Sequence, residues 1–415
     1  MEVVILFFSS YGEYWRQVKK ICVVELLSLK RIQSFKHVRV EEVDIVINKI
    51  ASSCSSSVTG AQVINLTEIL QALANNVLTR CTLGVRFESA HGNRFPKLSS
   101  DYLDMFCAFS FGDFFLSLGW MDVVTGLHNR FKKVIQELDV FLDQSIDEHL
   151  LRHSELQEDQ GRDQDSDKSD LMDILILSQQ DYKTNLSRNN IKAILLDMFL
   201  GGSDTSARTM EWAMAELIKN PEVMRKAQDE VRRVVGKKPK VEEHDINQMD
   251  YLKCIVKETL RLHTPIPLLT PRETAKSTQL AGYDIPAKTK VFINMWAIHR
   301  DSKVWDDAEE FLLERFMNSQ IEFFGQDFEY LPFGSGRRGC PGISFGINIV
   351  EYTLANLLYC FNWELPDGEK ADELDMTETF GLTASKKTPL HVVATMYASP
   401  QPIEEADGRR NSAPN

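Results

Sequence analysis

The chain has 415 residues, of which 43% are hydrophobic and 26% charged, a composition typical of globular proteins. Its formal net charge of -13 is not offset by a basic stripe, which argues against a nucleic-acid-binding protein. Its seven cysteines are scattered and never form a C-x-x-C pair, which disfavours a disulfide framework and a zinc or iron–sulfur site.

The N-terminal segment contains a short apolar run and then helical patterns. The run that follows Met1, "EVVILFF", is well short of the ~20 residues that a membrane span needs, and it lacks the basic flank of a targeting signal. We therefore expect no membrane anchor in this chain. Residues 66–78 follow Asn65, a suitable N-cap, with Glu68 three positions on, and this pattern predicts a helix.

Apolar residues recur at intervals of three and four along most of the chain, which predicts a mainly helical protein. The stretch 153–170 is heavily charged with one apolar residue, so we expect a mobile loop between helices. Because helical patterns continue on both sides of it, 1–396 is interpreted as a single domain. Strand signals are confined to 279–294, where alternation around Pro-Ala-Lys-Thr predicts a hairpin. Residues 403–415 are expected to form a disordered tail.

Two helical stretches carry unusual polar residues. In "LLDMFLGGSDTSARTMEW", the segment from Gly201 to Thr205 interrupts an apolar helix, although each interior glycine costs about 1 kcal/mol. This cost favours a function, and the alternative is a kinked helix whose hydroxyl groups bond to their own backbone. In "YLKCIVKETLRLH", Glu258 and Arg261 share a helix face. By itself such a pair is usually a solvated surface contact.

The segment 331–346, "LPFGSGRRGCPGISFG", presents one cysteine among glycines and arginines. Pro341 is a helix-start signal, so we expect Cys340 at the N-cap of the next helix, where the helix dipole would lower the pKa of its thiol. The glycines allow a flat group to approach closely, and Arg337 and Arg338 suit an anionic ligand. These features alone leave a nucleophilic cysteine and a structural cysteine as alternatives.

The pattern F-x-x-G-x-R-x-C-x-G is met by Phe333, Gly336, Arg338, Cys340 and Gly342. With this pattern the chain resembles the cytochrome P450 family, and the sequences of its motifs are most similar to those of the plant A-type microsomal group. The resemblance implies a mainly α fold with a large helical domain and a small β-rich lobe, of which the early strands are missing here. It also implies haem b as cofactor, with Cys340 as axial thiolate ligand of the iron.

The resemblance assigns roles to the other motifs. In the oxygen-activation segment, Gly202 makes room, Thr205 donates a hydrogen bond to the iron-bound oxygen and Asp204 helps to deliver protons. The core is braced by Glu258, Arg261 and, from "LERF", Arg315.

Several residues would contact the haem. Its propionates would be held by Arg338, by Arg272 of "TPRET" and by Trp15 and Lys19 of a helix that usually reads W-x-x-x-R. The lysine keeps the charge of arginine but loses its two-pronged geometry. Phe333 would pack beside the thiolate.

The implied activity is insertion of one atom of O2 into a hydrophobic small molecule, such as a terpenoid or phenolic plant metabolite. Electrons would come from an NADPH-dependent cytochrome P450 reductase, with cytochrome b5 as a further donor, at the cytosolic face of the endoplasmic reticulum membrane. A docking surface for the reductase would include Arg16, Lys20 and Arg337. The substrate would contact the stretches near 100–120, 195–205, 264–270 and 380–384, including Phe109, Phe111, Leu268, Leu269 and Leu382.

The family's usual N-terminal part, with its anchor and early strands, is absent from this chain by the same resemblance. We expect its loss to leave the 279–294 hairpin with an unpaired edge and to let water enter the cavity. Two alternatives to a monooxygenase follow. One is a truncated, non-catalytic product that cannot retain haem, and the other is a haem-thiolate isomerase or dehydratase on the same fold.

Overall fold

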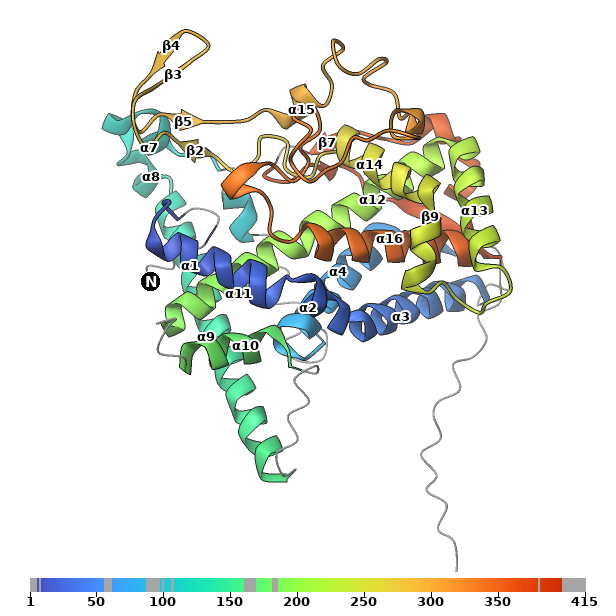
Figure 1. The fold of residues 1–415 in the computed structure, drawn as a ribbon, viewed down its shortest axis with the longest axis horizontal. Coiled ribbons are helices and arrows are strands. Elements are labelled where there is room, and N and C mark those ends of the chain that lie inside the picture. Colours follow the sequence, from blue (N-terminus) through green and yellow to red (C-terminus); the bar gives the residue numbers. More distant parts are fainter. Residues whose placement is uncertain are drawn as a thin grey trace, which may run out of the picture.

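The computed structural model describes residues 6, 9–55, 62–86, 98, 101–105, 108–159, 169–180, 186–379 and 381–397. Helices dominate this part of the chain, which confirms the predicted mainly α fold (Figure 1). The helices of the N-terminal half are α1 (Glu13–Ile21), α2 (Leu29–Ser34), α3 (Lys36–Ser55), α4 (Leu66–Leu83), α7 (Phe111–Phe114), α8 (Met121–Val124), α9 (Leu127–Asp159) and α10 (Leu171–Gln180). Those that follow are α11 (Arg188–Gly202), α12 (Asp204–Lys219), α13 (Pro221–Val235), α14 (Asp250–Leu262), α15 (Met295–Ile298) and α16 (Ile343–Cys360).

The helical core is built around α12, which packs against α4, α14 and α16. Its middle residues Ala213, Met214 and Ala215 are 0% exposed. A helix that is buried on nearly all sides lies inside a protein rather than on its surface. The break between α11 and α12, at the start of this helix, is partly buried and forms part of a cavity wall.

Helix α4 begins as the sequence predicts. The Asn65 side chain accepts a hydrogen bond from the backbone N–H of Glu68 at 3.3 Å, so Asn65 is the N-cap. The helix continues beyond the predicted residue 78 and ends at Gly84, whose φ of 68° is a left-handed C-cap conformation that favours glycine.

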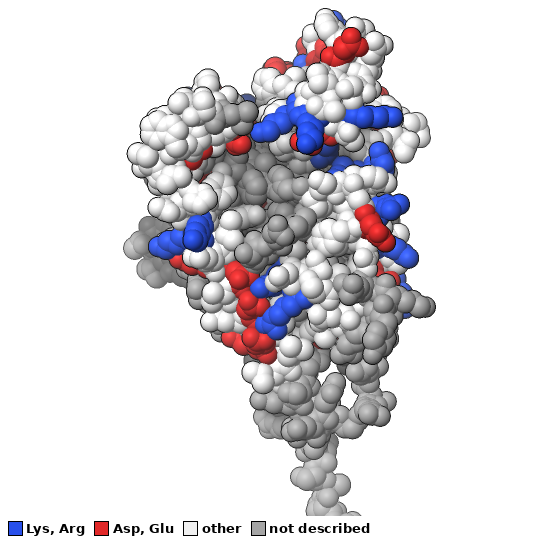
Figure 2. All heavy atoms as spheres, turned by 90° about the vertical axis from the view of Figure 1, so that its left-hand side faces the viewer, with Lys and Arg blue, Asp and Glu red and all other residues white. Residues whose placement is uncertain are grey.

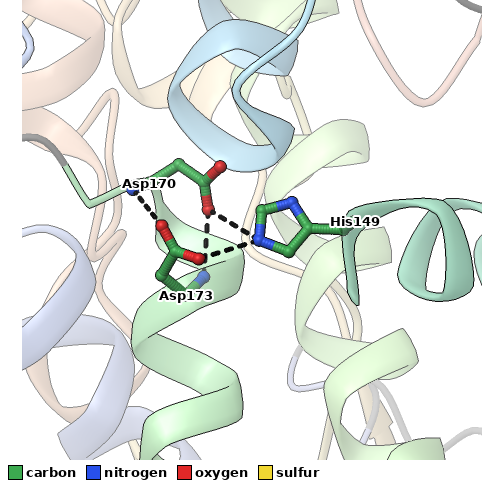
Figure 3. A group of neighbouring side chains, drawn as sticks. All are labelled: His149, Asp170 and Asp173. Carbon is green, nitrogen blue, oxygen red and sulfur yellow. Dashed lines mark hydrogen bonds and ion pairs between the residues drawn. The ribbon is translucent and has the colours of Figure 1, made fainter. Parts of the chain in front are cut away.

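The prediction of a mobile loop over 153–170 is wrong at both ends. Helix α9 continues to Asp159, because Glu, Gln and Leu are good helix formers even when the segment is charged. Asp170 is buried, and its carboxylate accepts the N–H of Asp173 at 2.9 Å while its own N–H donates to Asp173 at 3.0 Å. The ring Nε2 of His149, from α9, lies 2.8 Å from Asp173 Oδ1 (Figure 3). Residues 160–168 lie outside the described residues, as does the predicted tail at 403–415.

The strands are short and form four small antiparallel sheets among the described residues. One sheet has the order β1-β9-β6, and the others pair β2 with β5, β3 with β4 and β7 with β8. Their bounds are β1 (Val63–Asn65), β2 (Arg272–Glu273), β3 (Thr278–Leu280), β4 (Tyr283–Ile285), β5 (Lys290–Val291), β6 (Phe361–Glu364), β7 (Glu378–Thr379), β8 (Ser385–Lys386) and β9 (His391–Met396). The expectation that strands are confined to 279–294 is therefore wrong, because strands of two to six residues show too little alternation to be recognised.

The hairpin exists, but its turn is not at Pro-Ala-Lys-Thr. Strands β3 and β4 are joined by Ala281 and Gly282, whose φ angles of 49° and 84° are both positive. Two positive φ angles give the turn a twist that matches a two-residue hairpin. After Pro286 the chain leaves this hairpin, and β5 pairs with β2 instead. In the described residues each of these two sheets has two strands.

Helices α1, α7 and α8 and the β3–β4 hairpin lie on one side of the molecule (Figure 1). Several large apolar side chains of these elements are exposed. Figure 2 views the molecule from this side and shows wide uncharged areas between small groups of basic and acidic side chains. On α7, α8 and the turn between them, the exposed fractions reach 68% at Phe114, 61% at Trp120 and 75% at Val124. Within the described ranges, none of the helices combines the length and the apolar composition that crossing a membrane requires.

Candidate active site

A mainly apolar cavity of about 210 Å³ lies where the α11–α12 break, the start of α16, helix α1 and the cysteine loop meet. The sequence-predicted residues that line it are Trp15, Lys19, Gly202, Thr205, Leu269, Arg272, Phe333, Arg338, Cys340 and Leu382. Segments from five separate parts of the chain thus converge on one cavity. Asp204 and the three predicted core-bracing residues lie outside its walls.

The cysteine loop is a tight structure that exposes its sulfur to the cavity. The N–H of Cys340 donates to the carbonyl of Phe333 at 3.0 Å, and the N–H of Gly334 donates to Leu331 at 2.9 Å. Gly334 and Gly336 both have φ of 67°, a conformation that favours glycine. The glycines of the motif therefore let the chain fold back on itself and present Cys340.

Cys340 is not the N-cap of the following helix, as the sequence suggested. Gly342 occupies that position, and Pro341 lies in a turn before α16. The N–H of Gly342 donates to Cys340 Sγ at 3.3 Å. The expected fall in the thiol pKa is also wrong for the protein by itself: burial raises the pKa of Cys340, against smaller opposing effects of the Gly342 N–H and the Lys19 ammonium. Cys340 is exposed, and it lines the cavity.

Three cationic side chains gather at one end of the cavity. Arg338 donates to the carbonyls of Leu6 at 3.1 Å and Ser9 at 2.6 Å, and Lys19 Nζ donates to Gly339 at 2.7 Å. Arg272, the third, donates to the Thr270 hydroxyl. Burial is the main cause of a lowered pKa at each of the three cations.

This cation group fits an anionic ligand. In the described part of the chain no carboxylate forms an ion pair with Lys19, Arg272 or Arg338. Partly buried positive charges without a counter-ion are unfavourable. The indole Nε1 of Trp15, whose ring lies 4.6 Å from the Arg338 guanidinium, is also buried and has no hydrogen-bond acceptor among the described residues. The propionates of a haem would supply both the missing negative charge and the missing acceptor, so the residues present fit that group.

The α11–α12 break at Ser203 lies in the cavity wall. Four hydroxyl groups around it donate to carbonyls four residues earlier, and they belong to Ser203, Thr205, Ser206 and Thr209. Such back-bonding satisfies carbonyls where a helix bends. Thr205 thus lines the cavity while its hydroxyl donates to Gly201 at 2.7 Å, which is the contact expected for the kinked-helix alternative.

Gly202 is needed for close helix packing. A Cβ at this position would lie 3.2 Å from Leu78 Cδ1 and 3.3 Å from Leu78 Cδ2. The close approach of Leu78 on α4 therefore favours a glycine at this position, in addition to the predicted role of Gly202 in making room in the cavity.

The carboxylate of Asp204 is held by two partners. Its Oδ2 accepts from the hydroxyl of Thr383 at 2.7 Å, and its Oδ1 lies 3.3 Å from Arg208 Nε. Thr383 itself lines the cavity, so it lies between the acid and the enclosed space. Sequence reasoning included 380–384 in the wall but missed this contact, because residues 179 positions apart give no local signal.

The predicted bracing residues form a buried cluster. Glu258 and Arg261 are both 0% exposed and joined by two hydrogen bonds of 2.8 Å. Arg315 Nε lies 3.3 Å from the same carboxylate. Arg261 also donates to the carbonyls of His299 at 2.6 Å and Ala308 at 2.8 Å. The surface-contact alternative for this pair is therefore wrong.

Some predicted substrate contacts do not reach the cavity. Phe109 is 57% exposed and stacks on Phe114 with ring centroids 5.2 Å apart, and Leu268 is 41% exposed. Neither residue lines the cavity, and Phe111 does not line it either. Aromatic and leucine side chains have no sequence signal that separates a cavity wall from an exposed surface.

The basic residues of the suggested docking surface are exposed. Arg16 and Lys20 lie on α1, and Arg337 lies in the cysteine loop with its guanidinium 4.4 Å from the Tyr11 ring. The hydrogen bond from Lys19 to Gly339 joins α1 to that loop. The exposed cations therefore belong to two neighbouring segments, one of which carries Cys340.

The chain was compared with known proteins. A family model described as Cytochrome P450 matches residues 4–391. Cytochrome P450 71A1 of Persea americana is 52% identical over 396 residues, which cover 94% of this chain and 77% of that protein. Phenylacetaldehyde oxime monooxygenase of Prunus mume is 50% identical over 395 residues, or 94% and 73% of the two chains. Desmethylyatein synthase of Sinopodophyllum hexandrum is 48% identical over 394 residues, or 94% and 77%. A family match over nearly all of the chain, with relatives of about half identity, shows that this chain belongs to the cytochrome P450 family of haem-thiolate monooxygenases.

Proposed function

We propose that the chain, with 1–396 as one catalytic domain, inserts one atom of O2 into a hydrophobic specialised metabolite, such as a terpenoid or a phenolic compound. The main observation behind the proposal is the cavity, in which one thiol and three cations, without carboxylate ion-pair partners among the described residues, face mainly apolar walls. The relatives support this substrate class, because two are named for an oxime and for desmethylyatein, and a further relative from Strychnos nux-vomica is a strychnine-11-hydroxylase.

The residues that would hold haem line the cavity. Cys340 would ligate the iron, and Lys19, Arg272, Arg338 and the Trp15 N–H would bind the propionates. When bound, the haem activates O2, and electron donation from the thiolate favours cleavage of the O–O bond. Ligation to a metal removes the thiol proton, which overcomes the effect of burial on the Cys340 pKa.

Residues at the α11–α12 break would transfer protons to the site of oxygen activation. Thr205 would turn its hydroxyl from the Gly201 carbonyl towards the cavity, since both positions lie on the same wall. Asp204 would exchange protons through Thr383, whose hydroxyl it binds at 2.7 Å. The apolar walls would exclude water, which protects against loss of the activated oxygen.

Electrons would come from an NADPH-dependent cytochrome P450 reductase, with cytochrome b5 as a second donor. The exposed cations Arg16, Lys20 and Arg337 support a docking surface for an acidic protein, and opposite charges at such a surface speed association. We place the protein at the cytosolic face of the endoplasmic reticulum membrane, and the exposed apolar residues on α7 and α8 support contact with a lipid surface.

The spectrum of the purified chain, reduced and treated with carbon monoxide, tests the proposal. Thiolate-ligated haem gives a strongly red-shifted Soret band, which we expect for the wild type and not for Cys340→Ala. A wild-type chain without this band would contradict the proposal and favour the non-catalytic alternative. Reversing the charges of Arg16, Lys20 and Arg337 should slow reduction by the reductase and leave the carbon monoxide spectrum unchanged.

A further inference from the structure

We propose that His299 is a positioning residue that couples the buried Glu258–Arg261–Arg315 cluster to the loop that presents Cys340. The inference rests on the proposed function, because its importance comes from Cys340 as the iron ligand. His299 lies just after α15, where neither the cysteine motif nor the Glu258–Arg261 motif includes it.

His299 is 0% exposed. Its carbonyl and both of its ring nitrogens form hydrogen bonds, to the cluster, to the end of α14 and to the cysteine loop. Its carbonyl accepts from Arg261 Nη1 at 2.6 Å. Its ring Nδ1 lies 2.6 Å from the hydroxyl of Thr264, just after α14. Its ring Nε2 accepts from the backbone N–H of Leu331 at 3.0 Å.

These partners admit one protonation state of the ring. A backbone N–H is always a donor, so Nε2 of His299 carries no proton and the ring proton is on Nδ1. That proton is donated to Thr264 Oγ1, whose own hydrogen is donated to the carbonyl of Leu260 at 2.9 Å. A protonated ring would lose the bond to Leu331. The ring is therefore a fixed, neutral connector between α14 and the loop.

Leu331 is the first residue of the segment that leads to the iron ligand. Its carbonyl accepts the N–H of Gly334 at 2.9 Å, and Cys340 N–H is bonded to Phe333 at 3.0 Å. In the described part of the chain, the side chains of Glu258, Arg261 and Arg315 make no hydrogen bond to 332–342. The bond from His299 to Leu331 is thus a direct connection between a residue bound by the cluster and the start of the cysteine loop. A second bond, from the Tyr330 hydroxyl to the carbonyl of Lys257 at 2.8 Å, joins α14 to the residue before Leu331.

The main test compares His299→Leu, which cannot accept a hydrogen bond, with His299→Gln, whose amide oxygen can replace Nε2. In the full chain, site-resolved hydrogen exchange should be on the order of tenfold faster at Leu331 and Cys340 in His299→Leu. Exchange in α12 should be unchanged. The red-shifted carbon monoxide band should fall in His299→Leu, and both signals should be largely restored in His299→Gln.

The matched control is His263→Gln. His263 is also buried, but its ring binds the carboxylates of Glu216 at 2.7 Å and Glu378 at 3.2 Å rather than the cysteine loop. We expect this variant to keep wild-type exchange at Leu331. If His299→Leu does not fold, Thr264→Val replaces it. Without the Thr264 hydroxyl, nothing holds the ring proton of His299 on Nδ1, so Nε2 is no longer fixed as the acceptor and exchange at Leu331 should also be faster.

Acid sensitivity is a second readout. Burial, and then the positive charges of Arg261 and Arg300, lower the pKa of His299 to about 3, against an ordinary value of ~6.5. Glu258, the nearby acid, is neutralised by Arg261 and Arg315. The folded state favours the neutral ring, so its stabilisation is complete above ~6.5 and is lost as the pH falls toward 3. The band of the wild type should decline over this range more steeply than that of His299→Gln.

Three results would overturn the inference. The first is wild-type exchange at Leu331 in both His299→Leu and Thr264→Val. The second is an equal increase in exchange at Leu331 in His299→Leu and in the control His263→Gln. The third is faster exchange throughout α12 and α14 in His299→Leu, which would indicate general destabilisation. The proposed function fails separately, if the wild type gives no red-shifted band, and hydrogen exchange at Leu331 then still decides whether His299 holds the loop.

Discussion

Glu258 and Arg261 show that burial decides how much an i,i+3 ion pair contributes to stability. The same i,i+3 spacing occurs in Glu222 and Arg225, whose side chains are 80% and 60% exposed. At 0% exposure, Glu258 neutralises two arginines and also accepts the N–H of Leu312 at 3.0 Å.

We predict that Glu258→Gln lowers the free energy of unfolding by about 3–5 kcal/mol, since it leaves buried guanidinium groups without a counter-ion. Urea unfolding followed by far-ultraviolet circular dichroism measures this change. Glu222→Gln is the matched control and should have little effect. Equal effects of the two substitutions would contradict the electrostatic account of the buried pair.

Thr383 illustrates a residue whose importance comes from one contact. We predict that Thr383→Val, which removes the hydroxyl bonded to Asp204, raises the peroxide released per NADPH consumed several-fold, because losing one positioned hydrogen bond is worth about 1 kcal/mol. Thr383→Ser keeps the hydroxyl and should stay near the wild type. A normal peroxide yield in Thr383→Val would show that Asp204 does not deliver protons through this residue.

At the scale of elements, the packing of α11 against α4 depends on Gly202. We predict that Gly202→Ala lowers the free energy of unfolding by about 1–3 kcal/mol, because the new methyl group would lie 3.2 Å from Leu78. Thermal unfolding measures the loss. The double variant Gly202→Ala, Leu78→Ala should destabilise less than the sum of the single changes, and strict additivity would exclude this contact as the cause.

Elements differ in how well the sequence predicts them. Helix α4 was predicted from one cap and its apolar spacing, because both signals lie within the helix. The hairpin was placed in the correct region, but its turn was misassigned to Pro286–Thr289 rather than Ala281 and Gly282. Strand β1 was missed because its partner β9 lies more than 300 residues away.

At the scale of the whole molecule, pH acts on stability through Glu351 of α16. Burial is the largest cause that raises the pKa of Glu351 to about 7. The folded state therefore favours the protonated acid, and its contribution to stability is lost as the pH rises from about 4.5, the ordinary value, toward 7 and above.

We predict that the free energy of unfolding of the wild type falls by roughly 1–3 kcal/mol over this range relative to Glu351→Gln. Urea unfolding at several pH values provides the comparison. Parallel pH profiles for the two proteins would mean that Glu351 is not perturbed in the fold.

The sequence by itself determined the helical fold class, the start of α4 and the cysteine loop, because caps, glycine turns and short motifs are local. The resemblance to a family, rather than any local pattern, supplied most of the residues that meet at the cavity. The sequence did not determine the turn of the hairpin, the burial of Asp170 or the rise in the Cys340 pKa. Only the tertiary structure decided these, together with the links from His299 to Leu331 and from Thr383 to Asp204. The physical reason is that burial and hydrogen bonding between distant residues depend on how the helices pack, and no local pattern records that packing.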